Sequence, residues 1–167
     1  MRARFSTIVL TGLILVGCSS ASRGPLLFQS PTGWKVKHKP SGDLPFYTVI
    51  ASTPDEGSLM FYQWPSPSRP EEIPTLVQQL ADGFLKKANG HSEFTLASKE
   101  YRIEQLAGEH CQGSYVTFLA TTSSGRRTLT AIFMINLTGK IWYGQFIGTP
   151  EAWKQAITVV QSIKKNG

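Results

Sequence analysis

The side chains that could bind a metal or attack a substrate are few and scattered. The chain has two cysteines and three histidines. His38, His91 and His110 lie far apart, and no His-Glu-x-x-His or paired-cysteine spacing is present to suggest a zinc site. His110 and Cys111 are adjacent, but neighbours on a strand point to opposite faces, so they cannot easily share one ion. The sequence predicts no metal and no cofactor.

Two common catalytic motifs do not occur. The Gly-x-Ser-x-Gly spacing of serine hydrolases is not found. Neither is the phosphate-binding Gly-x-x-x-x-Gly-Lys. We therefore expect a protein that is not an enzyme. An enzyme of unrecognised type stays open, because a site assembled from distant residues leaves no local motif.

Cys18 stands in a different chemical context. Arg2 and Arg4 precede an apolar run from Ile8 to Val16. A transmembrane helix needs about 20 apolar residues, so this run is too short to span a bilayer. Its length suits the apolar core of a signal peptide, which has about 7–15 residues. Residues 1–17 are expected to be that signal peptide.

The stretch Leu15-Val16-Gly17-Cys18 resembles the lipobox of bacterial lipoproteins, in which an aliphatic residue and two usually small residues precede a cysteine. The resemblance implies a thioether-linked diacylglycerol on Cys18, cleavage after Gly17 and acylation of the new amino group. Ser19 follows where aspartate favours inner-membrane retention in many Gram-negative bacteria, so an outer-membrane anchor facing the periplasm is expected. The alternative is an ordinary secretory signal cut after Ala21.

Composition indicates one globular domain, residues 25–167, behind a polar tether, residues 18–24. The chain is 41% hydrophobic and 17% charged, as in folded proteins. Its net charge is +6, and 15 basic residues against 11 acidic ones remain without Arg2 and Arg4. This modest, scattered excess does not indicate a nucleic-acid partner. With Cys18 lipidated, Cys111 has no disulfide partner and is expected to be buried and inert.

Alternating apolar residues and turn residues predict an antiparallel sheet with two helices. Residues 131–135 are apolar on both faces, which favours a central strand covered on both sides. One helix is expected from Pro74 to Ala88, and another from Pro150 to Lys165 with Thr149 as its cap and Lys164-Lys165 at its C-terminal end. The predicted strands are Leu26–Phe28, Trp34–Lys39, Phe46–Ser52, Ser58–Trp64, Phe94–Gln105, Gln112–Thr122, Thr128–Leu137 and Ile141–Ile147.

This order of elements resembles the PsbP/Mog1-like fold, and in particular small DcrB-like periplasmic lipoproteins. The resemblance covers roughly Leu27 to Ile163 and depends on Pro31-Thr32-Gly33-Trp34, Gly139–Tyr143 and Thr149-Pro150-Glu151. It implies an α+β fold with an antiparallel β-sheet sandwiched by helices, in α/β/α order. It also implies a mostly non-catalytic binding or assembly role. No ligand-binding residue of the family can be matched to a position in this chain.

Two groups of residues are candidate partner contacts. Lys35, Lys37 and Lys39 share one face of a predicted strand, either as protection of a sheet edge or as a stripe for an anionic partner. Trp64 and Arg69 flank a proline-rich segment, and both residue types often dominate interfaces. In the other interpretation, Trp64 ends a strand in the core and the prolines only lead to the first helix.

Taken together, these features predict a lipid-anchored, non-catalytic envelope module. Its expected partners are the membrane, through the lipid on Cys18, and another envelope protein that it binds or helps to assemble. The alternative is a carrier that holds a small apolar ligand or lipid between sheet and helices.

Replacing Cys18 with serine tests the lipobox prediction. The Cys18→Ser variant should take up no labelled fatty acid and should remain uncleaved or be released, because the acylated sulfur is gone. Fatty-acid labelling and fractionation measure both effects. Labelling of the variant, or a wild-type protein that fractionates as soluble, would contradict the lipobox prediction.

Overall fold

The computed structural model describes residues 19–22, 26–41, 44–51, 56–66, 68–89 and 93–165. Cys18, the signal segment and part of the tether lie outside these residues. The strands are β1 (Ser19–Ser22), β2 (Leu26–Ser30), β3 (Lys35–Ser41), β4 (Leu44–Ile50), β5 (Gly57–Gln63), β6 (Phe94–Leu96), β7 (Glu104–Ala107), β8 (Gln112–Thr122), β9 (Arg127–Leu137), β10 (Lys140–Gly148) and β11 (Lys164–Lys165). The helices are the 3-10 turn η1 (Pro70–Glu72), α1 (Ile73–Ala88) and α2 (Pro150–Gln161).

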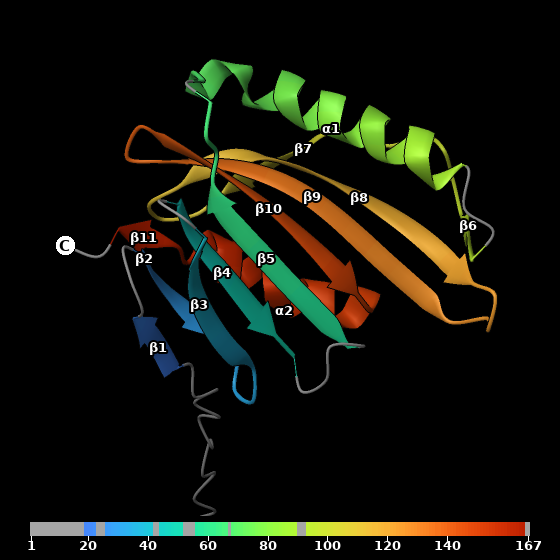
Figure 1. Cartoon of the computed structure of the whole chain (residues 1–167), viewed down its shortest axis with the longest axis horizontal. Helices are drawn as coiled ribbons and strands as arrows, with labels where there is room; N and C mark the ends of the chain where they lie inside the picture. The colour runs from blue at the N-terminus through green and yellow to red at the C-terminus, as the bar shows by residue number, and fades with distance from the viewer. Residues whose placement is uncertain are drawn as a thin grey trace, which may run out of the picture.

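The strands form two antiparallel sheets. The larger sheet has eight strands in the order β3-β4-β5-β10-β9-β8-β6, and β7 also pairs with β8. The smaller sheet has the order β1-β2-β11. Figure 1 shows α1 along the β8–β9 side of the large sheet and α2 on its other face, next to the small sheet. The predicted α+β fold, an antiparallel sheet between helices, is confirmed.

β9 is the centre of the core. Its residues 131–135 are all buried, and they alternate between two clusters of apolar side chains. Ala131, Phe133 and Ile135 pack on the α2 side, whereas Ile132 and Met134 pack on the α1 side. The prediction of a central strand covered on both faces is confirmed.

Local sequence signals position both helices. The Thr149 side chain accepts a hydrogen bond of 3.1 Å from the Ala152 N–H, and Pro150 occupies the first turn of α2, as predicted. α1 begins at Ile73, one residue before the predicted start at Pro74. The turn η1 runs directly into α1 and carries Ile73 in the helical conformation, although a residue before proline usually avoids it. Neither α1 nor α2 is long and apolar enough to cross a membrane.

The prediction of one strand from Phe94 to Gln105 is wrong. Residues 97–103 are irregular and separate β6 from β7. The Tyr101 hydroxyl donates a 2.6 Å hydrogen bond to the Asp82 carboxylate of α1, and its ring packs against Phe118. This contact draws the segment out of the sheet and toward the helix.

Two short strands at the ends of the domain also differ from the expected tether and helix end. β1, at residues 19–22, pairs with β2, so these tether residues belong to a sheet. Lys164 and Lys165 pair with the opposite edge of β2 as β11. Ser162 helps to hold this arrangement, because its hydroxyl accepts a 2.8 Å hydrogen bond from the Gln29 N–H.

A methyl group added at Gly144 should destabilise the fold. Gly144 lies opposite Phe133, and a Cβ there would come within 2.0 Å of the phenyl ring. Because Phe133 is fully buried, Gly144→Ala should cost about 1–3 kcal/mol of unfolding free energy, as overpacking does. Gly83→Ala in α1 is the control, since nothing lies within 4 Å of its Cβ and alanine favours helix. Urea unfolding that shows equal stability for both variants would contradict this packing.

Candidate functional site

One face of the large sheet is covered only in part. α1 packs mainly on β8 and β9 and reaches β10 at side chains such as Ile141 and Tyr143, so no helix of the described residues lies over the same face of β4, β5 and most of β10 (Figure 1). Antiparallel partners point to the same side, and the register places one set of side chains here. We call the partly or fully exposed members of this set the open sheet face; they are Thr48, Ile50, Ser58, Met60, Tyr62, Trp64, Tyr143, Gln145 and Ile147.

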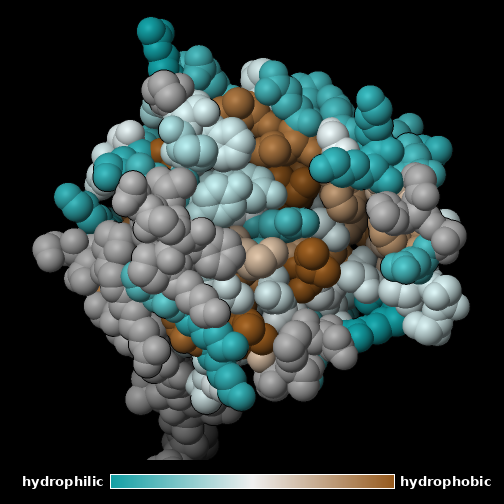
Figure 2. All heavy atoms as spheres, viewed as in Figure 1, coloured by the Kyte–Doolittle hydropathy of each residue, from teal (hydrophilic) through white to brown (hydrophobic). Residues whose placement is uncertain are grey.

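The open sheet face is apolar and aromatic. Tyr143 packs against Tyr62 at 5.2 Å between ring centroids and against Trp64 at 6.0 Å. Burial, and secondarily Tyr62, raises the pKa of the Tyr143 hydroxyl, so it stays neutral at physiological pH. Ile147 is 42% exposed, more than any other large hydrophobic side chain in the described residues. Figure 2 shows brown and pale residues across the middle of this face, below the teal surface of α1. Because large contiguous apolar patches on folded domains often mark interaction sites, the open sheet face is the candidate surface.

Lys35, Lys37 and Lys39 on β3, which we call the lysine row, border this face. Lys35 pairs with Ile50 and Lys37 with Thr48, so both project on the same side as the open sheet face. Both side chains are exposed, as the alternation predicted. Lys39 pairs with residue 46 in the same register, and its side chain lies outside the described residues.

Trp64 and Arg69 lie in different local environments. Trp64 is half-buried, continues the pairing of β5 through a 2.8 Å hydrogen bond to the Ile141 carbonyl, and packs with the α1-side cluster. Arg69 is exposed, and its N–H donates to the Glu72 carboxylate at 2.9 Å. Pro70 and Glu71, which follow it, lie beside the ends of β8 and β9. Trp64 thus ends a strand against the core and the chain continues to the first helix, as the alternative interpretation expected, and the roles of Trp64 and Arg69 as partner contacts stay predictions.

Two hollows lie between α1 and the sheet. One has a volume of about 360 Å³ and adjoins the open sheet face through Tyr143 and Gln145. The second, of about 210 Å³, lies on the other side of Phe84 and reaches Ile147. Neither hollow has an acidic lining residue, and Lys87 lines the first. These residues could not be found from the sequence, because their proximity depends on the register of four strands.

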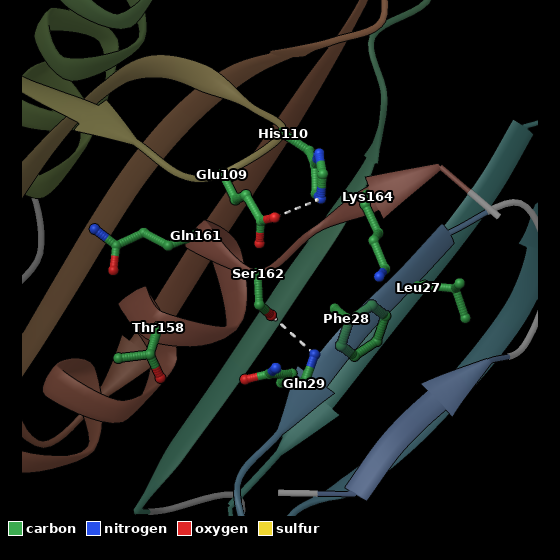
Figure 3. A pocket seen from close by; sticks show the side chains of 9 residues that line it. All are labelled: Leu27, Phe28, Gln29, Glu109, His110, Thr158, Gln161, Ser162 and Lys164. Atoms are coloured by element: carbon green, nitrogen blue, oxygen red, sulfur yellow. Dashed lines mark hydrogen bonds and ion pairs between the residues drawn. The ribbon is translucent and has the colours of Figure 1, made fainter.

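A third hollow, which we call the terminal pocket, lies where the ends of the domain meet. It has a volume of about 330 Å³ and is lined by β2, the end of α2, Lys164 of β11 and the turn with Glu109 and His110. Figure 3 shows Glu109, His110, Ser162 and Lys164 around it. A histidine, a carboxylate and a serine in one pocket could in principle form a nucleophilic triad.

The hydrogen bonds assign these groups to structure instead. The Ser162 hydroxyl donates to the Val159 carbonyl at 2.8 Å and accepts from the Gln29 N–H, so its proton is not available to a base. Glu109 and His110 are sequence neighbours 3.5 Å apart on the surface. Beneath them, Cys111 is buried, its thiol is 3.5 Å from the Val160 carbonyl, and burial raises its pKa. The predicted burial of Cys111 is confirmed.

No metal centre is present in the part of the chain that the structure describes. There, no three histidine, cysteine or carboxylate side chains lie close enough to hold an ion.

Substitutions in the terminal pocket test whether the Ser162 hydrogen bonds hold the two ends of the domain together. Ser162→Ala removes both the helix-end bond and the bond to β2, and should lower the unfolding free energy by about 1–2 kcal/mol. His110→Ala should change it by less than about 0.5 kcal/mol, because its ion pair is exposed. Chemical denaturation of both variants measures the difference. Equal losses would show that the Ser162 bonds do not hold the two ends together.

Comparison with known proteins identifies the fold. No protein-family model matches the chain, and no curated protein is similar to it in sequence. Among solved structures, cyanobacterial PsbP (CyanoP) from Synechocystis sp. PCC 6803 is similar with a TM-score of 0.56 and 15% identity, over 93% of this chain and 96% of that one. A Bacteroides thetaiotaomicron protein is similar with a TM-score of 0.50 and 10% identity, over 85% of this chain and 45% of that one. At these identities the likeness concerns architecture, and the chain has a PsbP-like α+β fold.

Proposed function

We propose that this protein is a lipid-anchored, non-catalytic module of the bacterial envelope that binds another envelope protein. The observation that carries the proposal is the open sheet face, where aromatic and aliphatic side chains lie on half of a sheet that no helix of the described chain covers. Specific protein interfaces use such apolar, aromatic centres with a charged rim. The lysine row supplies a charged border.

The alternatives have less support. Both sides of β9 are filled by side chains, and the two hollows between α1 and the sheet, of about 360 and 210 Å³, lie at or below the lower end of the about 300–1,000 Å³ of most small-molecule sites. This disfavours a carrier. The polar groups of the terminal pocket bond to one another and to the backbone, which disfavours a hydrolase.

The anchor would hold the domain close to the membrane. β1 begins at Ser19, directly after Cys18, and is paired with β2. If Cys18 carries lipid, almost no free chain separates the acyl groups from the folded domain. The module would therefore meet its partner at the membrane surface. An outer-membrane, periplasm-facing position remains part of this proposal.

Site-specific photo-crosslinking in native envelopes tests the proposed interface. A photoreactive amino acid at Tyr62 or at Ile147 should capture the same envelope protein, because both positions lie on the open sheet face. The control is Lys154, an exposed position of α2. Mass spectrometry of the adducts identifies the captured protein. The proposal fails if Tyr62 and Ile147 capture nothing, or capture the same set as Lys154.

A further inference from the structure

We infer, building on the proposed function, that the element seated on the open sheet face is an acidic amphipathic α-helix of the partner. It would lie beside α1 and complete the helical layer on this side of the sheet.

The uncovered area has the width of one helix. It comprises β4, β5 and β10, which are consecutive neighbours in the sheet. Strands lie about 4.8 Å apart, so three of them present a floor about 10–14 Å wide. An α-helix with its side chains is about 10–12 Å across. One helix fills this space between α1 and the lysine row, and a second would not fit.

α1 has a glycine, and therefore no side chain, at the position where the added helix would contact it. Gly83 lies in the middle of α1, is exposed, lines the hollow beside Tyr143, and has nothing within 4 Å of where its Cβ would be. Glycine inside a helix costs about 0.5–1 kcal/mol relative to alanine, and no contact within the described chain requires it here. A missing side chain allows a second helix to pack closely at this point.

Charge determines what kind of helix is favoured. Lys35 and Lys37 border the floor on the β3 side, and Lys87 lines the hollow on the α1 side. Cations on both sides of an apolar floor complement a helix with an apolar stripe and acidic flanks. Such a helix would place its stripe on Met60, Tyr62, Tyr143 and Ile147.

Addition of a partner strand fits less well. β3 is the edge of the large sheet next to the open sheet face, and it contains Pro40, which has no N–H to donate to a new strand. Its lysines protect the edge further. A helix on the face avoids both obstacles.

The test uses the full chain purified in detergent and designed helical peptides. One peptide has a leucine stripe flanked by glutamates, the second has lysines in place of the glutamates, and the third is the acidic peptide interrupted by proline. Fluorescence anisotropy measures their affinities. The acidic peptide should bind about tenfold more tightly than the basic one, since three exposed charge pairs contribute about 0.5 kcal/mol each. The peptide with proline should not bind.

Variants locate the bound peptide. Gly83→Leu should abolish binding and Gly83→Ala should weaken it less, because the larger side chain fills the space for the helix. The double variant Lys35→Glu, Lys37→Glu should lose the preference for the acidic peptide. Lys154→Glu on α2 is the matched charge control and should bind like wild type. Circular dichroism checks that each variant is folded.

Equal binding of the acidic and basic peptides, or full binding by folded Gly83→Leu, would overturn the inference. If crosslinking from Tyr62 nevertheless captures an envelope protein, the proposed function survives and only the helix is rejected. If the acidic peptide binds as described but crosslinking captures nothing, helix binding by the open sheet face is supported and the proposed partner in the envelope is rejected.

Discussion

Burial of β9 on both of its faces is the constraint on which the rest of the structure depends. A strand that is apolar on one face can pair with its neighbours and expose its other face to water. Residues 131–135 are apolar on both faces, so both faces must be covered by other elements. α2 and the small sheet supply one cover, and α1 supplies the other. The register is fixed by the same requirement, because a slip of one residue would exchange the two sets of side chains. The close approach of Phe133 to Gly144 strengthens this, since only glycine leaves room for the ring.

The two covers differ in extent, and this asymmetry produces the candidate surface. On the α2 side, aromatic residues such as Tyr47, Phe61 and Phe146 are fully buried. On the α1 side, one helix covers β8 and β9 and leaves the neighbouring strands with tyrosine, threonine and glutamine among the aliphatic residues. Tyrosine suits this partly solvent-exposed position because its ring is apolar and its hydroxyl can form a hydrogen bond with water. This mixture of apolar and polar groups suits the proposed role of a surface that is exposed in the free domain and covered by a partner.

The sequence predicted elements whose causes are local. The helix at Pro150 has its own cap in Thr149, and β9 is recognisable from its composition alone. The exposure of Lys35 and Lys37 followed from alternation. The break between β6 and β7 was not predictable, because it depends on the Tyr101–Asp82 hydrogen bond between segments distant in sequence. For the same reason, the sequence pointed to Trp64 but gave no indication that Tyr62, Tyr143 and Ile147 share its face of the sheet.

The position of β2 between β1 and β11 has a consequence for how the protein is made. Leu26 and Phe28 are core residues near the start of the domain, and β2 pairs locally with β1, yet its other partners are α2 and residues 164–165, which come much later in the chain. Contacts between such distant segments form late, because the loop between them must close first. If the protein is exported as proposed, the small sheet can be completed only after α2 and residues 164–165 have emerged. If Cys18 is also lipidated, the modifying enzyme would act on a chain whose small sheet is still incomplete.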